Sequence, residues 1–524
     1  MTARAWSGMD RRRFLAMSGL SGAAVMLGTG EWTSTGAAEP AKMAYPFTLG
    51  VASGDPRQGG FVLWTRLAPR PLLADGHGGM GDNIIRVQYE VANDHRFRSI
   101  VRRGSAEATP ALAHSVHPTI KGLEPDRVYF YRFMVGGHIS PVGRTRTVPV
   151  GPANELTFAF ASCQLWAAGY FTAYRHMAND DLDLVVHLGD YIYEYGVDSQ
   201  PRGRLETVPD HFSGSVASDL AGYRLQYALT KSDPDLQRAH RRFPWLMTLD
   251  DHDVANDWDG ANTAPAFLAQ RAAAFKAWYE HLPLRAAQQP RGADMQVYRR
   301  LRYGDLATFH VLDTRQFRDD QACGGALSTD CGERLEPERS IMGADQERWL
   351  RNGLGASTAS WDVLANQATM GENDRDPGDG QLLNMDIWDG YAANRDRVLQ
   401  AAVDQGARDL VVITGDKHQH VAMDLHRDFS DPASPIVGVE LVGTSITSGG
   451  DGEPQTDLDR DFLAGNRHMK YINSQRGYVR CRVTPQTYAA DFRVVDHVVD
   501  RTDGAVRTDK TVVIEHGRPG LLPD

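Results

Sequence analysis

The chain has 524 residues, of which 42% are hydrophobic and 23% are charged, and its formal net charge is −11. This length exceeds that of one ordinary domain, and the average composition excludes a disordered chain, a collagen-like repeat and a disulfide-dense mini-protein. So acidic a protein is not expected to be a general binder of nucleic acid or of anionic lipid surfaces. The charge does not exclude a phosphate substrate, because bound metal ions can reverse it locally.

The first forty residues have the pattern of an export signal. Three arginines, Arg11 to Arg13, precede an uncharged stretch over residues 16–30, and small residues at 36–38 offer a cleavage site. Paired arginines at this place are typical of the twin-arginine route, which exports folded proteins. We therefore expect residues 1–38 to be a signal peptide, the twin-arginine export machinery to be a partner, and the mature protein to be periplasmic or secreted. The apolar run is too short for a transmembrane segment, and a disordered basic tail is the alternative.

Residues 45–150 consist of short alternating apolar runs separated by glycine, proline and aspartate. The runs over 61–64, 85–91 and 127–134 show no helical period, which predicts an all-β sandwich. The segment 123–131 resembles the turn and strand of fibronectin type III modules, in which a tyrosine packs across the corner. We therefore expect a small, all-β, fibronectin III-like domain at this end of the chain.

Residues 153–510 have a different pattern, because apolar runs that end in polar residues alternate with helical segments. Long apolar strands bounded by helices predict an α/β domain whose sheets are buried. The runs cover residues 156–161, 184–188, 245–249, 307–312 and 410–414, and the expected helices cover 265–282, 344–354 and 392–405.

Residues able to bind metal ions follow four of these runs. In an open α/β sheet, ligands gather beyond the carboxyl ends of the strands, so the four loops are expected to form one site. Each piece has a structural alternative, since a Gly-Asp pair is common in turns, an acidic run can be a solvated loop, and a lone cysteine can be a core thiol. Their joint occurrence favours the functional interpretation. In chain order the residues are Cys163, Asp190, Tyr193, Asp251, His252, Asp416 and His418.

The segments 160–163, 187–194, 250–253, 312–315 and 414–418 resemble those of the alkaline phosphatase D (PhoD-like) family, a branch of the calcineurin-like metallophosphatases. The resemblance extends over nearly the whole chain. It implies an α/β fold with a metallophosphatase-type β-sandwich flanked by helices, after the small β domain. It also implies a metal-dependent enzyme of alkaline pH optimum that hydrolyses phosphate mono- or diesters through attack by a metal-activated hydroxide.

By this resemblance, a ferric ion, Fe³⁺, is held by Cys163, Asp190, Tyr193 and His418, and Asp190 also bridges to calcium. A thiolate, a phenolate and a carboxylate offer three negative charges to one trivalent ion, and an imidazole adds a neutral donor. Tyr191 and Tyr193 point to opposite faces if their segment is extended, so only one of them can reach the metal. We choose Tyr193 and expect Tyr191 to pack in the core.

The resemblance places one or two calcium ions, Ca²⁺, beside the iron, with Asp251, Asp416 and Asn256 as ligands. Ligands that offer only oxygen suit calcium or magnesium rather than zinc. His252 takes the place of the histidine that protonates the leaving oxygen in the broader metallophosphatases. One departure from the family is Asp253, which stands where glutamate is expected.

Two further residues are candidates for substrate binding. Arg224 could meet the charge that develops on the phosphoryl oxygens, and its alternative role is that of a salt-bridge partner. Asn366 ends another apparent strand and could either line the pocket or serve the fold. His187 is expected to be a core histidine, whereas His420 could line the pocket or support it from behind.

The remaining cysteines are expected to be structural. Cys323 and Cys331 lie in one glycine-rich loop, close enough along the chain to form a disulfide in an oxidising compartment. Cys481 lies in an alternating, strand-like run and is expected to be a buried core thiol.

The substrate is expected to be a small-molecule or lipid phosphate ester. A phospholipase D-like lipid phosphodiesterase is the alternative within the same chemistry, because the sequence does not fix the leaving group. A non-catalytic, calcium-dependent surface-binding protein is the alternative from another class. Cys163 together with Tyr193 argues against it, since a site that binds only calcium has no use for a thiolate or a phenolate.

Overall fold

The computed structural model describes residues 43–199, 203–214, 216–325, 327–376, 378, 380–406, 409–431, 433–499 and 504–523. The signal peptide expected at residues 1–38 lies outside the described residues. Within these ranges, no helix is both long enough and apolar enough to cross a membrane.

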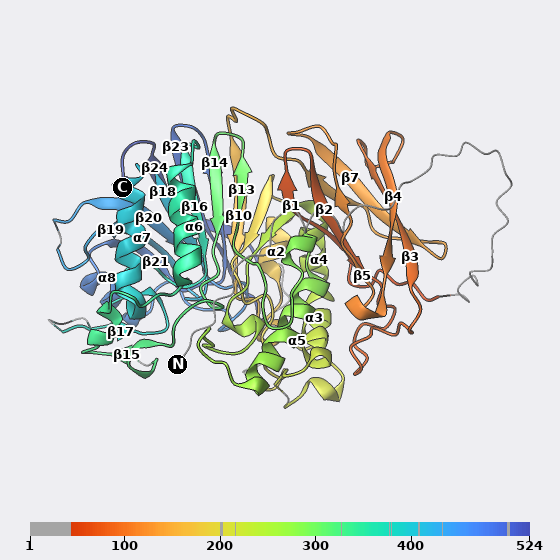
Figure 1. Cartoon of the computed structure of the whole chain (residues 1–524), viewed down its shortest axis with the longest axis horizontal. Coiled ribbons are helices and arrows are strands. Elements are labelled where there is room, and N and C mark those ends of the chain that lie inside the picture. The colour runs from red at the N-terminus through yellow and green to blue at the C-terminus, as the bar shows by residue number, and fades with distance from the viewer. Residues whose placement is uncertain are drawn as a thin grey trace, which may run out of the picture. The chain divides into compact units, whose positions relative to one another are not determined.

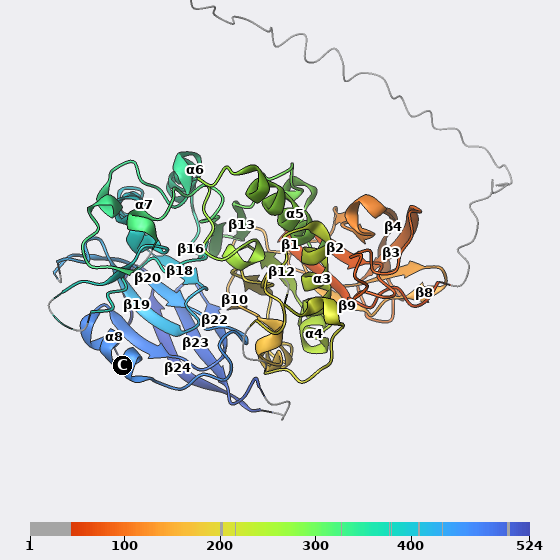
Figure 2. The same ribbon diagram turned by 90° about the horizontal axis from the view of Figure 1, so that it is seen from below.

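Two large sheets form the centre of the fold, and the first of them has ten strands (Figure 1). In order it comprises β24 (Val506–Glu515), β23 (Thr487–Val495), β22 (Gly477–Val483), β10 (Leu156–Ala161), β11 (Leu184–His187), β12 (Pro244–Met247), β1 (Val51–Arg57), β2 (Gly60–Arg66) and β5 (Ser115–Val116), with β6 (Thr119–Ile120) also paired to β2. The strands β10, β11, β12 and β1 run parallel, whereas β22, β23 and β24 form an antiparallel edge (Figure 2).

The second sheet has seven strands. In order it comprises β13 (Arg299–Tyr303), β14 (Ala307–Val311), β16 (Trp361–Asn366), β18 (Leu410–Thr414), β20 (Ile436–Val442), β19 (His420–His426) and β21 (Met469–Asn473). Its middle strands β14, β16, β18 and β20 are parallel and buried on both faces, as their continuous apolar runs predict. All five apolar runs predicted from the sequence form strands of these two sheets, so that prediction is confirmed.

A hydrophobic core lies between the two sheets and joins them into a sandwich. The rings of Phe158 on β10 and Phe309 on β14 lie 5.1 Å apart and nearly perpendicular, and Cys481 on β22 packs in the same core. An edge-to-face aromatic pair of this kind adds about 0.5–1.5 kcal/mol beyond the area it buries. Both the predicted β-sandwich and the buried core thiol are confirmed.

Helices cover the outer faces of both sheets. The first sheet carries α2 (Thr172–Met177), α3 (Leu220–Lys231), α4 (Pro234–Arg242) and α5 (Pro265–His281), whose apolar side chains join those of β10, β11 and β12 in one core. The second sheet carries α6 (Gly343–Gly355) and α7 (Ala392–Asp404), and α8 (Asp457–Gly465) packs beside β21. The three predicted helices are confirmed as α5, α6 and α7.

Four helices, α2, α3, α4 and α8, were not predicted from the sequence. The buried face of α3 includes Arg224 and Lys231, so the helix has no continuous apolar stripe by which the sequence could identify it. The α4 segment is short and highly charged, and Asp233 before Pro234 is its clearest signal, since the Asp233 carboxylate caps two backbone amides of the first turn.

The β region at the start of the described chain forms a second sandwich, one layer of which is the β1–β2 end of the ten-stranded sheet. Its separate sheet comprises β4 (Ile100–Ala108), β3 (Ile85–Ala92), β7 (Val128–Val135) and β8 (His138–Ile139), with β9 (Gly143–Arg146) paired to β7. This sheet packs on β1 and β2, and the hydroxyl of Tyr129 accepts a hydrogen bond from the backbone of Glu124 at 3.0 Å, which confirms the predicted corner tyrosine. Because β1 also pairs with β12, the boundary between residues 45–150 and 153–510 stays a prediction. At the other end, β24 continues past residue 510 to Glu515.

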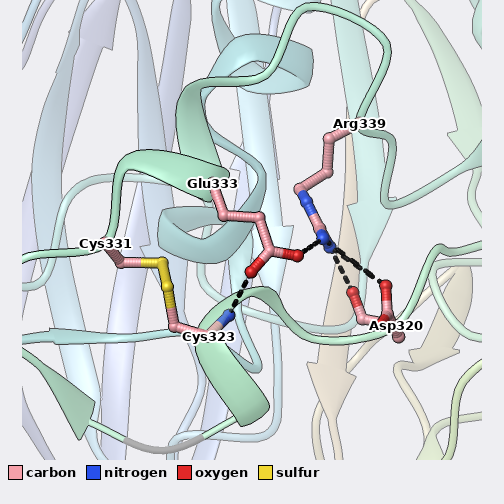
Figure 3. Close-up of a disulfide and its surroundings, with 5 residues drawn as sticks. All are labelled: Asp320, Cys323, Cys331, Glu333 and Arg339. Carbon is pink, nitrogen blue, oxygen red and sulfur yellow. Dashed lines mark hydrogen bonds and ion pairs between the residues drawn. A yellow bond between two sulfur atoms is a disulfide. The ribbon is translucent and has the colours of Figure 1, made fainter.

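A disulfide joins Cys323 to Cys331, as the sequence analysis considered (Figure 3). The carboxylate of Glu333 accepts a hydrogen bond of 2.7 Å from the backbone of Cys323 and forms an ion pair with Arg339. The loop closed by the disulfide contains β15 (Leu327–Ser328), which pairs with β17 (Leu383–Asn384) outside the loop. The tethered loop therefore supports the segment that leads from β17 to Asp386.

Candidate metal centre

Four loops meet beyond the carboxyl ends of β10, β11, β12 and β18. A bridge between Ser162 and Ser445 links the first sheet to the second there. Three groups of side chains form, and in each the ligand atoms all lie within 4.8 Å of one another. The structure thus brings together six of the seven residues that the strand-end pattern identified, together with Asp250. The groups are Cys163, Asp190 and His418; Asp190, Asp251 and His252; and Asp250, Asp251 and Asp416.

The backbone at these loops is strained. Cys163, Asp190, Asp416 and His418 all have left-handed backbones, with φ angles of 59°, 53°, 61° and 58°. This conformation costs a non-glycine residue about 1–3 kcal/mol and persists only where the surroundings impose it. Four such residues within one small volume indicate that the fold bends each loop to bring its side chain to a common point.

Tyr193 is the seventh residue, and it lies in the group formed by Cys163, Asp190 and His418. Its hydroxyl donates to Asp190 Oδ2 at 3.0 Å, lies 3.2 Å from His418 Nε2 and accepts from Ser448 at 2.8 Å. Tyr191 instead packs in the core, where its hydroxyl lies 2.7 Å from a histidine ring nitrogen. The two tyrosines therefore diverge, as expected.

Burial governs the charge of this group. Burial raises the pKa of Cys163, Asp190 and Tyr193 well above their usual values, and nearby carboxylates add to the effect in all three. Burial also lowers the pKa of His418 to about 3, so its imidazole is neutral, which is the form that binds metal. A thiol, a phenol and a carboxyl that must lose protons, beside one neutral nitrogen, fit a trivalent cation.

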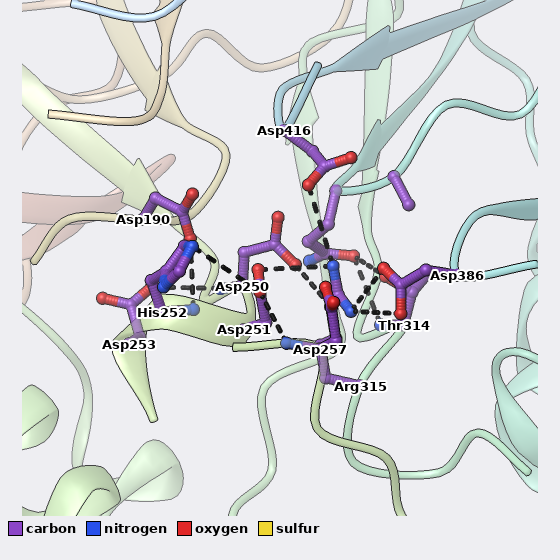
Figure 4. Close-up of polar contacts among 12 residues, drawn as sticks. Asp190, Asp250, Asp251, His252, Asp253, Asp257, Thr314, Arg315, Asp386 and Asp416 are labelled. Carbon is purple, nitrogen blue, oxygen red and sulfur yellow. Dashed lines mark hydrogen bonds and ion pairs between the residues drawn. The ribbon is translucent and has the colours of Figure 1, made fainter. Parts of the chain in front are cut away.

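The neighbouring group contains only oxygen donors, with a buried guanidinium among them (Figure 4). Arg315 is fully buried and reaches Asp250 at 2.6 Å, Asp386 at 3.1 Å, Asp251 at 3.3 Å and Asp416 at 3.8 Å. Arg318 pairs with Asp386 as well, but two positive charges do not balance four carboxylates. Asp250 Oδ2 is buried without a hydrogen-bond donor among the described residues, and Asp251 Oδ1 has only its 3.3 Å ion-pair contact with Arg315, which fits a hard cation that takes carboxylate oxygens.

Carboxylates in this group differ in how easily they ionise. Burial, reinforced by Asp250, raises the pKa of Asp416 well above its usual value. Burial also opposes ionisation of Asp386, yet Arg315 and Arg318 hold the pKa of that carboxyl well below its usual range. Asp386 is therefore a fixed negative charge next to the cluster, and the sequence analysis did not identify it.

His252 lies where the two groups meet. Its Nδ1 is 2.9 Å from Glu194 Oε2, its Nε2 is 3.9 Å from Asp251 Oδ2, and its ring lies 4.3 Å from that of Tyr193. Although burial favours the neutral ring, the carboxylates of Asp251 and Asp190 raise the pKa of His252 well above its usual value. The imidazole is therefore held as a proton donor by Glu194, a residue for which the sequence analysis named no role.

Three other predicted residues have their polar groups engaged elsewhere. Asn256 is exposed and accepts from Tyr195 at 3.2 Å. Arg224 is buried and forms two hydrogen bonds of 2.7 Å with Glu280, so the salt-bridge alternative describes its contacts. The amide of Asn366 is buried between β16 and β18, where it donates to the backbone of residue 368 at 2.5 Å and to the residue 414 hydroxyl at 3.3 Å. None of these contacts is with a member of the three groups.

Two further histidines, one expected in the core and one weighed as a pocket residue, belong to the fold. His187 is fully buried within β11, as expected, although its Nε2 has no partner among the described residues. His420 accepts from the backbone of Thr444 at 3.1 Å, and its other ring nitrogen lies 3.2 Å from the carbonyl of Arg493. It supports the loop behind His418 rather than lining the groups.

Comparisons with known proteins agree with this arrangement. A family model described as PhoD-like phosphatase matches residues 158–492, and one described as PhoD-like phosphatase, N-terminal domain, matches residues 33–149. Alkaline phosphatase D of Bacillus subtilis (strain 168) is 47% identical over 526 residues, which cover 98% of this chain and 88% of that protein. A solved structure described as PhoD is 46% identical, with a TM-score of 0.87 and coverage of 92% of this chain and 93% of that one. This chain therefore belongs to the PhoD-like phosphatase family and is a phosphoesterase.

Proposed function

We propose that this chain is an exported phosphoesterase that hydrolyses phosphate mono- or diesters at a mixed iron–calcium centre, with His252 as the proton donor to the leaving oxygen. The observation that carries the proposal is the contrast between two adjoining groups. One combines a thiol, a phenol and an imidazole, and the other offers only carboxylates.

The iron would be held by Cys163, Asp190, Tyr193 and His418. The pKa shifts described above support this assignment, because three of these side chains carry ionisable protons and the fourth is a neutral imidazole. Zinc would suit a thiolate with an imidazole, but a phenolate in the same set favours a harder, more highly charged ion.

The calcium would be held by Asp190, Asp251 and Asp416, with Asn256 as a further ligand after a side-chain rotation. Asp251 Oδ1 accepts no hydrogen bond among the described residues and contacts only Arg315 as an ion pair, which supports this choice, as does the absence of nitrogen and sulfur from the group of Asp250, Asp251 and Asp416. When bound, the two kinds of ion supply charge that stabilises the phosphoryl oxygens and lowers the pKa of the attacking water.

Protein side chains provide the remaining chemistry. Glu194 holds His252 Nδ1, which leaves the proton on Nε2 free to move to the departing alcohol oxygen. Ser448 donates to the hydroxyl oxygen of Tyr193, and a donor at this place favours the phenolate over the phenol. Arg315 keeps the carboxylates of Asp250 and Asp251 in position, because it contacts both from within the fold.

Metal analysis of protein purified without chelators tests this proposal. We expect iron and calcium together, and a visible charge-transfer band from thiolate and phenolate that disappears in Tyr193→Phe. A protein that contains only zinc would overturn the ligand assignment. Parallel assays on a chromogenic monoester, a bis-ester and phosphatidylcholine micelles identify the preferred leaving group, and turnover of the micelles alone would contradict the proposed substrate class.

Export is a separate part of the proposal, and it rests on the sequence of residues 1–38. We expect the full chain to reach the periplasm or the medium, and the paired substitution Arg11→Lys with Arg12→Lys to retain it inside the cell. Equal export of both forms would contradict a twin-arginine signal.

A further inference from the structure

A pocket of about 480 Å³, separate from the candidate metal centre, is lined by several positively charged side chains. It is formed where α4 lies beside β9, and its wall includes the end of α2 and a loop of the small β region (Figure 2). Four arginines and one histidine line it, and no acidic side chain does so among the described residues. The polar residues are His95, Arg144, Asn179, Arg238, Arg241 and Arg242.

Among the described residues, no carboxylate forms an ion pair with any of these four arginines. Arg144 donates to the backbone carbonyl of Arg242 at 3.4 Å, and Arg238 donates to the amide oxygen of Asn179 at 2.6 Å. The side chain of Arg241 is exposed and contacts no acceptor in the part of the chain that the structure describes. Beside the pocket, by contrast, Arg146 pairs with two aspartates and Arg175 with one.

The absence of partners is unexpected for this composition. Acidic residues outnumber basic ones by 67 to 56, so a carboxylate partner is readily available to a surface arginine. Like charges within a few ångströms repel one another, and guanidinium groups within about 8 Å are little screened by physiological salt. Burial, the neighbouring Arg242 and Arg146 lower the pKa of Arg144, although the charges of Asp181 and Asp183 oppose this effect without forming an ion pair with it. An anion in the pocket would relieve this repulsion.

We propose that this pocket is a second anion site, which binds a phosphoryl dianion apart from the metal centre. Guanidinium groups match the oxygens of phosphate through paired hydrogen bonds. Four of them around one cavity carry more positive charge than the single negative charge of a carboxylate would balance, and a dianion fits them better. The ligand is inorganic phosphate or the phosphate group of an organic ester, which present the same dianion. The pocket shares no residue with the metal-binding groups, so the inference does not depend on the proposed metals.

Modification of arginines by phenylglyoxal, followed by mass spectrometry, reads each position separately on the full, metal-loaded chain. We expect inorganic phosphate to slow the modification of Arg241 and Arg242 at least about fivefold, at constant ionic strength. Arg291 is an exposed arginine outside the pocket and serves as the reference, whose rate should not change. Phenylphosphonate carries the same dianion on an organic group, so protection by both ligands indicates an ester site and protection by phosphate alone indicates a site for free phosphate.

Two variants make the test specific. Protection of Arg242 is half complete at a certain phosphate concentration, and Arg241→Gln should raise that concentration about tenfold. Arg291→Gln should leave it unchanged. Both variants should turn over a chromogenic monoester normally. Asp190→Asn disables the metal centre, and in it the protection at Arg242 should persist. The inference is overturned if Arg291 is protected equally, if no protection occurs below about 10 mM phosphate, or if protection disappears with Asp190→Asn.

Discussion

The two halves of the metal centre balance their charge in different ways. In the half formed by Cys163, Tyr193 and His418, burial raises the pKa of the thiol and the phenol, so protons neutralise the ligands when no cation is bound. Arg476 lies nearby, but it donates to the carbonyls of His418 and Ser448 at 3.0 and 2.9 Å. Among the described residues, therefore, no guanidinium is hydrogen-bonded to the side-chain ligand atoms of this half.

The half formed by Asp250, Asp251 and Asp416 contains a buried guanidinium instead. Arg315 contacts all three carboxylates, and it also holds Asp386 ionised. A fixed charge cannot leave when a metal ion arrives, whereas protons can. Burial also raises the pKa of Asp250 to about 7 and that of Asp416 well above its usual value, so protons remain on part of the second half as well. We therefore expect the first half to release its protons when it binds its ion, and the second half to release fewer and to share its carboxylates between Arg315 and the ion.

Asp190 lies in the group of Cys163 and His418 and also in the group of Asp251 and His252, so it links the two halves and its loss should have the largest effect. Asp190→Asn removes a charge that the groups of Cys163 and His252 share, and we expect kcat to fall at least about 1,000-fold. Circular dichroism and metal content should show a folded chain with reduced iron and calcium. Asp389→Asn is the control, because Asp389 is equally buried but pairs with Arg395. Activity above a tenth of normal in Asp190→Asn would contradict the shared role.

Removing the guanidinium tests the second half directly. Arg315→Met leaves buried carboxylates without their counter-charge, and breaking such a contact costs about 3–5 kcal/mol of unfolding free energy. We expect that loss in chelator-treated protein and a smaller one when calcium is present, as measured by denaturant unfolding. Arg395→Met, at a buried ion pair outside the centre, should lose similar stability under both conditions. An equal loss of stability with and without calcium in Arg315→Met would contradict the inference that Arg315 and calcium balance the same carboxylates.

The residue that orients the proton donor should have the next effect. Glu194→Gln weakens the contact with His252 Nδ1, and loss of such a supporting partner costs about 10–100-fold in activity. The carboxylates around His252 raise its pKa, so the acid form persists to alkaline pH and activity is lost as the pH rises through that pKa. The alkaline limb of kcat/KM should therefore move to lower pH in Glu194→Gln. Glu347→Gln, at a buried carboxylate paired with Arg397, should leave the limb in place.

The sequence predicts the candidate ligands that follow regular strands better than it predicts the residues that support those ligands. Cys163, Asp190 and Asp416 each follow a buried apolar run closely, so their convergence could be inferred from the edge of a parallel sheet. Asp386 follows a strand of two residues, β17, which pairs with β15 in the loop that the disulfide closes. No periodic pattern marks such a segment, and its place becomes visible only in three dimensions.

Supporting partners are difficult to predict for a related reason. Arg315 could be read as one more surface arginine, because its burial among carboxylates depends on contacts across more than sixty residues of chain. Arg224 illustrates the same difficulty, since the sequence left open both a substrate role and a salt bridge, and only the structure shows its contact with Glu280 on α5. Glu194 could have been inferred, because a histidine that donates a proton needs a partner on its other nitrogen.

The smallest effect on stability should come from a substitution in the first half, Cys163→Ser. Its expected effect contrasts most clearly with the effect of Arg315→Met. Cys163→Ser replaces a neutral buried thiol with a neutral hydroxyl that can keep the 3.2 Å contact with Ser162. In chelator-treated protein we expect a loss of no more than about 1 kcal/mol, because no buried charge loses its partner. Iron content and the charge-transfer band should nevertheless fall at least about tenfold, since a hydroxyl is a much poorer ligand than a thiolate.

Cys481→Ser is the matched control for this substitution. Its thiol is equally buried, but it packs in the core between the sheets and accepts from Tyr488 at 3.4 Å, so the variant should lose stability while keeping its iron. If Cys163→Ser destabilised the chelated chain as much as Arg315→Met, the thiol group would also depend on a charge contact. The distinction between a proton-balanced half and a guanidinium-balanced half would then be wrong, because both halves would need a partner that cannot leave.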